Sequence, residues 1–196
     1  MNLISTLAIA MGAGWVSGIN LYAAVATLGL LGRFANLRLP GELDILTSWW
    51  IIGLAVALYL VEFIADKVPY VDTVWDAIHT FIRIPAGAVL AATAFGDFDR
   101  GVQVAAFLLG GGLALSAHGT KAGARAAINL SPEPASNIVA SLTEDVIAVG
   151  SILLSVFAPF ILFAVITGFV ILSFLMARKI LKAMKAMMLR LQQAFS

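Results

Sequence analysis

The sequence predicts an all-α, polytopic membrane protein, a compact bundle of about five to six helical segments. Hydrophobic residues make up 61% of the 196 residues, charged residues 12%, and the mean hydropathy is +1.00. Soluble domains are about half apolar and a quarter charged. Asp, Glu, Lys and Arg are absent from residues 1–32, 45–61, 101–120 and 146–177, and a spanning helix needs roughly 20 apolar residues. We therefore treat 1–196 as a single integral membrane domain.

The first apolar segment, residues 2–31, is longer than one bilayer crossing requires. Small and polar residues that favour a break interrupt it, namely Gly12, Gly14, Ser17, Gly18 and Asn20. We expect a helix that is either tilted or broken near GWVSGIN, residues 14–20.

The second span is expected within residues 47–69. Trp49 and Trp50 would form an aromatic anchor at one membrane interface. Glu62 and Asp66 lie one helical turn apart at its far end.

The next segment carries a polar stripe. Asp72, Asp76, His79 and Arg83 are spaced by four, three and four residues, which places them within about 60° of one another on a helix. Pro85 follows, and proline disfavours helical geometry in the residue before it, so we expect this helix to stop there.

The ten residues after the proline, 86–95, would cover only about 15 Å as a helix, half a bilayer. A half-length segment behind a proline is typical of re-entrant helices in transporters. The region 71–95 is therefore either broken or re-entrant at the proline, or a single kinked span from about residue 74 to 95.

A second polar stripe lies on the next long helix, expected over residues 101–129. His118, Lys121, Arg125 and Asn129 are spaced by three, four and four residues. They fall within about 80° of one another on a helix. This stripe is mainly cationic, whereas the first is mainly acidic.

The C-terminal part predicts further helices. Ser141 and Glu144 match a capping box, which predicts a helix start at residue 141. The apolar run 146–177 would be about 48 Å long if straight, too long for one crossing. Pro159 near its middle favours a hairpin of two short helices over one strongly kinked helix.

The tail 178–196 is basic. Arg178, Lys179, Lys182, Lys185 and Arg190 have no acidic residue among them, which places the C-terminus in the cytoplasm by the positive-inside rule. The tail is either an ordinary topology anchor or an amphipathic helix lying on anionic lipid.

Internal repetition is faint. GINLYAAVA at 18–26 and GTKAGARAA at 119–127 share a glycine and alanines after a long apolar lead. The similarity suits either a weak internal duplication, such as inverted repeats, or chance.

Each polar cluster can lie in water. The 71–83 helix would then lie on the membrane surface, residues 62–66 would end a helix at the interface, and 118–129 would extend into the cytoplasm. Residues 144–145 would only cap a helix. However, an ionised side chain at the bilayer centre costs about 2.5 to 3.5 kcal/mol. The competing expectation is that the acidic and basic stripes face each other or share one water-filled cavity.

The leading function for such a cavity is translocation of a small polar or lipid-linked anionic solute. Lys121 and Arg125 would attract a phosphate or carboxylate group. Asp72 and Asp76 would balance charge or relay protons, and His79 would titrate near neutral pH.

Two other functions compete with translocation. The chain can be a non-catalytic assembly or scaffold protein, because Gly119, Gly123 and Ala127, spaced by four, allow close helix approach. It can also be a metal-dependent membrane enzyme that holds a divalent metal with Asp72, Asp76 and His79 on one helical face. An enzyme is the less favoured class, since the sequence has no H-E-x-x-H, G-x-S-x-G or glycine-rich phosphate loop.

EFIADKVPYVDTVWDAIHTFIRIPAGA (62–88) and HGTKAGARAAINLSPEPASN (118–137) resemble the two signature regions of a family of small bacterial polytopic membrane proteins catalogued as a domain of unknown function. The resemblance covers essentially the whole chain. It implies an all-helical protein of the bacterial inner membrane and supplies no activity.

The signature regions coincide with the stripes, so we expect a polar cavity formed by residues 62–85 and 118–145. Its candidate residues are Glu62, Asp66, Lys67, Asp72, Asp76, His79, Arg83, His118, Lys121, Arg125, Asn129, Glu133, Asn137, Glu144 and Asp145. The expected partners are the lipid bilayer, an anionic solute or lipid head group, and a second copy of the chain in a homo-oligomer, with no nucleic acid. The sequence identifies no cofactor and leaves metal binding open.

Overall fold

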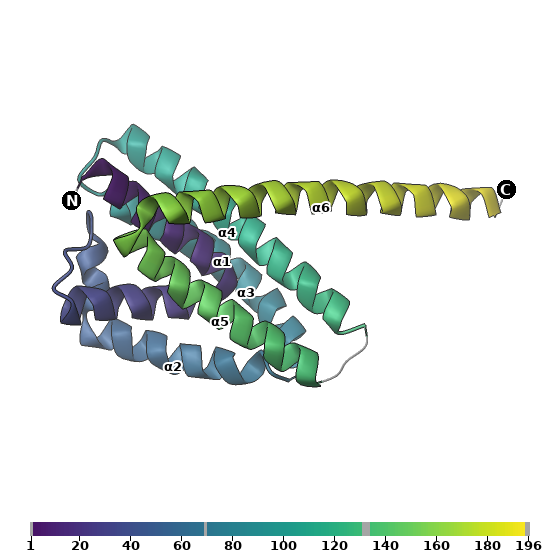
Figure 1. Cartoon of the computed structure of the whole chain (residues 1–196), viewed down its shortest axis with the longest axis horizontal. Helices are drawn as coiled ribbons and strands as arrows, with labels where there is room; N and C mark the ends of the chain where they lie inside the picture. Colours follow the sequence, from purple (N-terminus) through teal and green to yellow (C-terminus); the bar gives the residue numbers. More distant parts are fainter. Residues whose placement is uncertain (1, 69, 131–133, 195–196) are drawn as a thin grey trace.

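The computed structural model describes residues 2–68, 70–130 and 134–194, without the side chains of residue 134 and of most residues beyond 179. Within these residues the chain is all-helical, as predicted. The elements are α1 (Leu3–Phe34), the 3-10 helix η1 (Leu43–Thr47), α2 (Trp49–Ala65), α3 (Val71–Ala94), α4 (Arg100–Ile128), α5 (Pro134–Phe157) and α6 (Pro159–Ala194). The two termini lie at opposite ends, and α6 extends well beyond the other helices (Figure 1).

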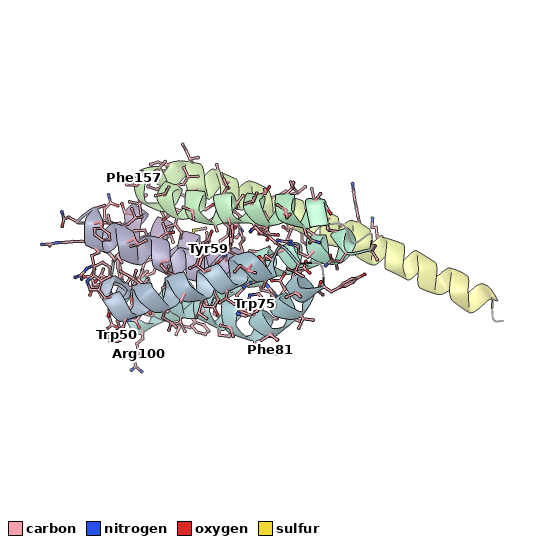
Figure 2. All side chains as sticks on the ribbon, turned by 90° about the horizontal axis from the view of Figure 1, so that it is seen from below. Trp50, Tyr59, Trp75, Phe81, Arg100 and Phe157 are labelled. Carbon is pink, nitrogen blue, oxygen red and sulfur yellow. The ribbon has the colours of Figure 1, made fainter. Side chains whose placement is uncertain are left out.

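The outer surface of the bundle is apolar. Trp50 is 89% exposed and Phe81 83% exposed, and Figure 2 shows both side chains projecting outward. Among the described residues, five helices are long and apolar enough to cross a membrane, and α2 is a shorter apolar helix of 17 residues. The chain is an integral membrane protein, because such a surface suits lipid and not water.

Helix α1 folds back on itself at Asn20, whose φ of −150° and ψ of 97° are not helical. Both halves run beside the same part of α5. Gly12 in the first half packs against Ser155, and Leu31 in the second half shares a surface hollow with Val149. Both ends of α1 lie at the same end of the bundle (Figure 1). The predicted break near GWVSGIN is confirmed, and it makes α1 a helical hairpin.

The first half of α1 packs closely against α3 and α4 through glycine. A methyl group at Gly18 would overlap the carbonyl oxygen of Ala114, and one at Gly14 would lie 2.8 Å from the Cα of Gly110. Such contacts let helix backbones approach closely. They place the α1 break in the middle of the bundle.

Helix α3 runs without interruption through Pro85, so the expectation that it stops there is wrong and the alternative of a single span is confirmed. Neighbouring groups can satisfy backbone atoms near a proline in a membrane helix. Here the Ser17 hydroxyl donates a hydrogen bond to the carbonyl of Arg83, in the turn that contains the proline, at 2.6 Å. The broken helix is therefore α1 and not α3.

Helix α4 matches its predicted range within one residue. Helix α5 begins at Pro134, seven residues before the predicted start at Ser141, so that prediction is wrong. Proline suits the first position of a helix, where its missing amide has no intrahelical partner to lose. The hairpin at Pro159 is confirmed, because α5 ends at Phe157 and α6 begins at the proline.

Candidate functional site

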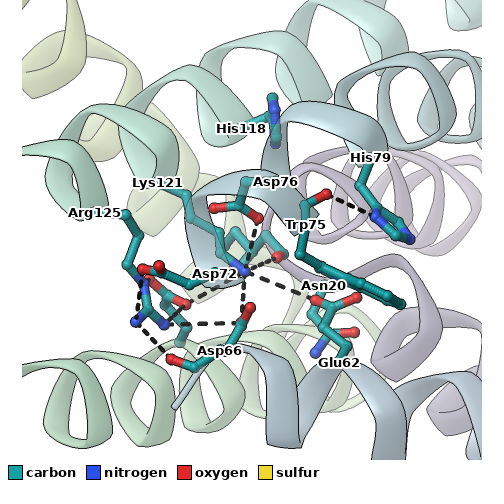
Figure 3. A network of polar contacts seen from close by, with 12 residues as sticks. Asn20, Glu62, Asp66, Asp72, Trp75, Asp76, His79, His118, Lys121 and Arg125 are labelled. Atoms are coloured by element: carbon teal, nitrogen blue, oxygen red, sulfur yellow. Dashed lines mark hydrogen bonds and ion pairs between the residues drawn. The ribbon is translucent and has the colours of Figure 1, made fainter. Parts of the chain in front are cut away.

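The acidic stripe of α3 and the cationic stripe of α4 face each other inside the bundle (Figure 3). Asp72, Asp76 and Arg83 from α3 and Lys121 and Arg125 from α4 are each at most 5% exposed. The interpretations that place these stripes in water are therefore wrong. Lipid cannot compensate such charges, so the bundle interior pairs them.

Arg83 joins α3 to the end of α2. Its guanidinium donates to Asp76 Oδ1 at 2.6 Å and to Glu62 Oε1 at 2.9 Å. Glu62 is fully buried, so it does not lie at an exposed helix end. His118 Nδ1 lies 3.4 Å from the same guanidinium, and because arginine only donates, this nitrogen accepts.

The Lys121 ammonium lies inside a cage of oxygen atoms. Its Nζ is 2.8 Å from Asp66 Oδ2 and 3.4 Å from Glu144 Oε2. Asp76 Oδ1 is 3.5 Å away and Glu62 Oε1 3.7 Å away. The lysine also donates to the backbone carbonyl of Ile19, at the α1 break, at 3.2 Å. We call these five oxygens the cation cage.

Arg125 joins α4 to α5 and to the segment after α2. It forms a two-pronged pair with Glu144, at 3.0 and 2.7 Å. It also donates to the backbone carbonyl of Asp66 at 2.9 Å, to that of Asn137 at 3.2 Å and to Asn137 Oδ1 at 3.1 Å. Asp72 Oδ2 lies 3.8 Å away. Glu144 therefore acts in the interior of α5 and does not cap it, contrary to the capping interpretation.

Asparagines close the network at the end of the bundle near residues 66–70. The Asn129 amide donates to both oxygens of Asp72, at 2.9 and 3.0 Å. Asn137 in turn donates to Asn129 Oδ1 at 3.0 Å. Glu144, with 17% of its side chain exposed, is the most accessible of the ion-paired carboxylates among the described residues.

Lys67 borders the network between α2 and α3. Its ammonium donates to the carbonyl of Phe63 at 2.9 Å and to Ser141 Oγ at 3.1 Å. Burial lowers the pKa of Lys67, because desolvation disfavours the charged form. Glu133, another predicted site residue, lies outside the described residues.

The break in α1 contributes backbone groups to the site. Asn20 Oδ1 accepts from the amide of Ala23 at 2.9 Å and so caps the second half-helix. The Asn20 amide donates to Asp145 Oδ1 at 3.3 Å. The carbonyl end of the first half-helix, at Ile19, faces the Lys121 ammonium, as expected from the negative end of a helix dipole.

His79 lies to one side of the ion pairs (Figure 3). Its Nδ1 is 2.8 Å from the carbonyl of Trp75, and because a carbonyl only accepts, Nδ1 carries a proton. Its Nε2 is 3.0 Å from the hydroxyl of Tyr22, and the Trp75 ring stacks on the imidazole at 4.2 Å. His79 is held by aromatic neighbours and not by the carboxylates.

The metal hypothesis finds no matching geometry. Asp72 binds Asn129, Asp76 binds Arg83, and His79 binds Tyr22 and Trp75. In the part of the chain that the structure describes, no group of three or more His, Cys, Asp or Glu side chains is arranged to hold a metal ion.

The ion-paired network has more acidic than basic side chains. Among the described residues, its ion pairs join three cations to five carboxylates, those of Glu62, Asp66, Asp72, Asp76 and Glu144. Four carboxylate oxygens, Glu62 Oε2, Asp66 Oδ1, Asp76 Oδ2 and Asp145 Oδ2, are buried without a hydrogen-bond partner within the described chain, and so is the donor Arg83 Nε. Buried polar atoms of this kind are satisfied by ordered water or by another bound group.

Several residues of the site were absent from the predicted set. Ser17, Asn20 and Tyr22 come from α1, and Thr80 bonds His118 Nε2 at 2.6 Å. The polar interruption of the first apolar segment was a usable signal for Ser17 and Asn20. No sequence signal indicates the role of the Ile19 carbonyl, because every residue has a backbone carbonyl whatever its side chain.

Comparison with known proteins identifies a family and no activity. The family model described as a domain of unknown function, DUF4126, matches residues 7–179. No curated protein and no solved structure matches the chain. The match covers both stripes, the whole of α2 to α5, most of α1 and the apolar part of α6.

Proposed function

The chain belongs to the DUF4126 family, whose description names no activity, and from its geometry we propose that it translocates a small monovalent cation across the membrane. The observation that carries the proposal is the position of the α1 break at Asn20, inside a buried network of charged residues. Broken helices whose ends point at a charged site near mid-membrane are the usual construction of ion and solute sites in secondary transporters.

The charge balance favours a cation over the anion expected from the sequence. Lys121 and Arg125 were expected to attract an anion, but carboxylates already contact both. An anion would have to displace these partners, and the ion-paired network has two more carboxylates than cationic side chains. A cation or a proton reduces that excess.

Polar and apolar residues divide the bundle along its length. Asp72 and Arg83 are about 16 Å apart along α3, roughly half the thickness of a bilayer core. Beyond Arg83 the same face of α3 presents Gly87 and Ala91 to α1 and α4. A solute that enters from the Asp72 end would thus reach the middle of the bilayer, where the closely packed small residues would block its further movement. This supports a site that opens to one side at a time.

The orientation follows from the basic tail. Arg178 and Lys179 end the apolar part of α6, and α6 runs toward the end of the bundle at which α4 ends and α5 begins (Figure 1). The positive-inside rule places this end in the cytoplasm. The polar half of the bundle then faces the cytoplasm, in the inner membrane of a bacterium.

Flux into liposomes tests the proposal. Liposomes that contain the purified protein should take up ammonium, sodium or protons faster than protein-free liposomes do. Dyes inside the liposomes measure this uptake under an imposed gradient. Asp76→Asn should lower the flux at least tenfold, because Asp76 contacts both Arg83 and Lys121. The matched control is Asp97→Asn, in the exposed turn after α3. Flux equal to that of empty liposomes for every cation contradicts the proposal.

A scaffold function is the second candidate, and one observation favours it. A methyl group at Gly119 or Gly123 on α4 would meet nothing within 4 Å, so this glycine face is free of the other described helices and can receive a helix of another chain. The native chain has no cysteine, so single cysteines can be placed without background. Labelling of Asp76→Cys by an aqueous reagent favours transport. Complete protection, together with a stoichiometric partner in the purified sample, favours the scaffold.

A further inference from the structure

We propose that the cation cage is a binding site for ammonium or a primary amine, and that Lys121 is its tethered occupant in the closed state. The inference rests on the proposed cation translocation and specifies its substrate class. The translocated cation takes the place of the lysine ammonium, and the lysine returns when the cation leaves.

The geometry of the cage fits a nitrogen with several N–H donors. Four carboxylate oxygens and one backbone carbonyl surround Lys121 Nζ, and the two shortest distances are 2.8 Å to Asp66 and 3.2 Å to Ile19. These are hydrogen-bond lengths, longer than the roughly 2.0 to 2.6 Å at which oxygen ligands bind divalent metal ions. The cage thus holds an ammonium group, that of Lys121, at hydrogen-bond distances.

The cage also has acceptors to spare. Glu62, Asp66 and Asp76 each use one oxygen on the lysine or on Arg83, and each has a second buried oxygen without a partner in the described chain. These three side chains are at most 4% exposed. A species that is cationic and donates hydrogen bonds would pair with these oxygens and also offset the surplus of carboxylates. Ammonium and primary amines meet both conditions, whereas a quaternary amine meets only the first.

A tethered competitor explains how such a site stays closed. The lysine reaches the cage from α4, while the cage atoms come from α1, α2, α3 and α5. While the ammonium is in place, it draws these elements together. A soluble amine that takes its place would leave Lys121 as an unpaired buried cation, which favours movement of α4 away from the cage.

Removing the tether tests the proposal. Lys121→Ala should leave the cage without its occupant, so the purified variant in detergent should show a saturable rise in Tm with ammonium chloride and methylammonium chloride. Sodium and tetramethylammonium chloride, at the same ionic strength, should raise the Tm much less. Wild type should show no such rise, because its own lysine competes. Lys67→Ala is the matched control, since this lysine lies beside the network but outside the cage.

Two results would overturn the inference: no dependence of the Lys121→Ala Tm on ammonium, or equal stabilisation by tetramethylammonium. If Lys121→Ala does not fold, Lys121→Ala with Asp66→Asn removes one charge of each sign, and it should keep a saturable response to ammonium through the remaining cage oxygens. Its failure to respond also counts against the cage. Ammonium binding by Lys121→Ala without flux in the wild type would refute translocation and leave the site. Wild-type flux without ammonium binding by Lys121→Ala would refute the site and leave translocation.

Discussion

Arg83→Met removes a fully buried guanidinium that pairs with two carboxylates. Asp76 at 2.6 Å and Glu62 at 2.9 Å would each lose this partner, and neither can reach bulk solvent. Breaking a buried pair by removing one partner costs about 3 to 5 kcal/mol. For a chain of this length that corresponds to a fall in Tm of roughly 6 to 20 °C.

Thermal unfolding in detergent, followed by circular dichroism, measures this loss. Arg100→Met is the matched control, because Arg100 is exposed at the start of α4, and it should stay within about 0.5 kcal/mol of wild type. Adding Glu62→Gln to Arg83→Met should recover part of the loss, since one unpaired charge is gone. If the Tm of Arg83→Met equals that of Arg100→Met, the claim that this network is buried and coupled is refuted.

Two further predictions concern α1. Gly18→Ala should lower the unfolding free energy by about 1 to 3 kcal/mol, because the methyl group overlaps the carbonyl of Ala114. The control Gly112→Ala, with open space beside it, should be neutral or stabilising by up to about 1 kcal/mol. Equal effects at the two sites would contradict the close packing. Asn20→Ala should cost about 0.5 to 2 kcal/mol through loss of a helix cap and should also lower cation flux, while Asn2→Ala, which removes the exposed cap of α1, should leave flux unchanged. Unchanged cation flux in Asn20→Ala would contradict the claim that the α1 break takes part in translocation.

Spacing and composition predict much of the site from the sequence. The two stripes could be found because membrane helices contain few charges, and a regular spacing of three and four fixes their helical faces. The hairpin at Pro159 was predictable because the apolar run around it is too long for one crossing. These features depend on local sequence and on one property of the bilayer.

The errors come from tertiary contacts that override local signals. Pro85 normally ends a helix, but α3 continues because its neighbours pack around the proline turn and Ser17 bonds the carbonyl of Arg83. Ser141 has the pattern of a helix cap, yet it lies inside α5, and its hydroxyl accepts a hydrogen bond from Lys67. The sequence predicted a break in α1 but not that the helix folds back on itself there. That geometry depends on contacts of the α1 glycines with α3 and α4, which form only once those helices are in place.

Sidedness of labelling tests the central claim most directly, namely that α1 re-enters and places its break in the charged network. Single cysteines replacing Leu3, Arg38 and Leu130, all exposed, would be labelled in sealed vesicles with an impermeant maleimide. The hairpin predicts that Leu3→Cys and Arg38→Cys react from the same side of the membrane and Leu130→Cys from the opposite side. Reaction of Leu3→Cys and Arg38→Cys from opposite sides would show that α1 crosses the membrane and would contradict the account.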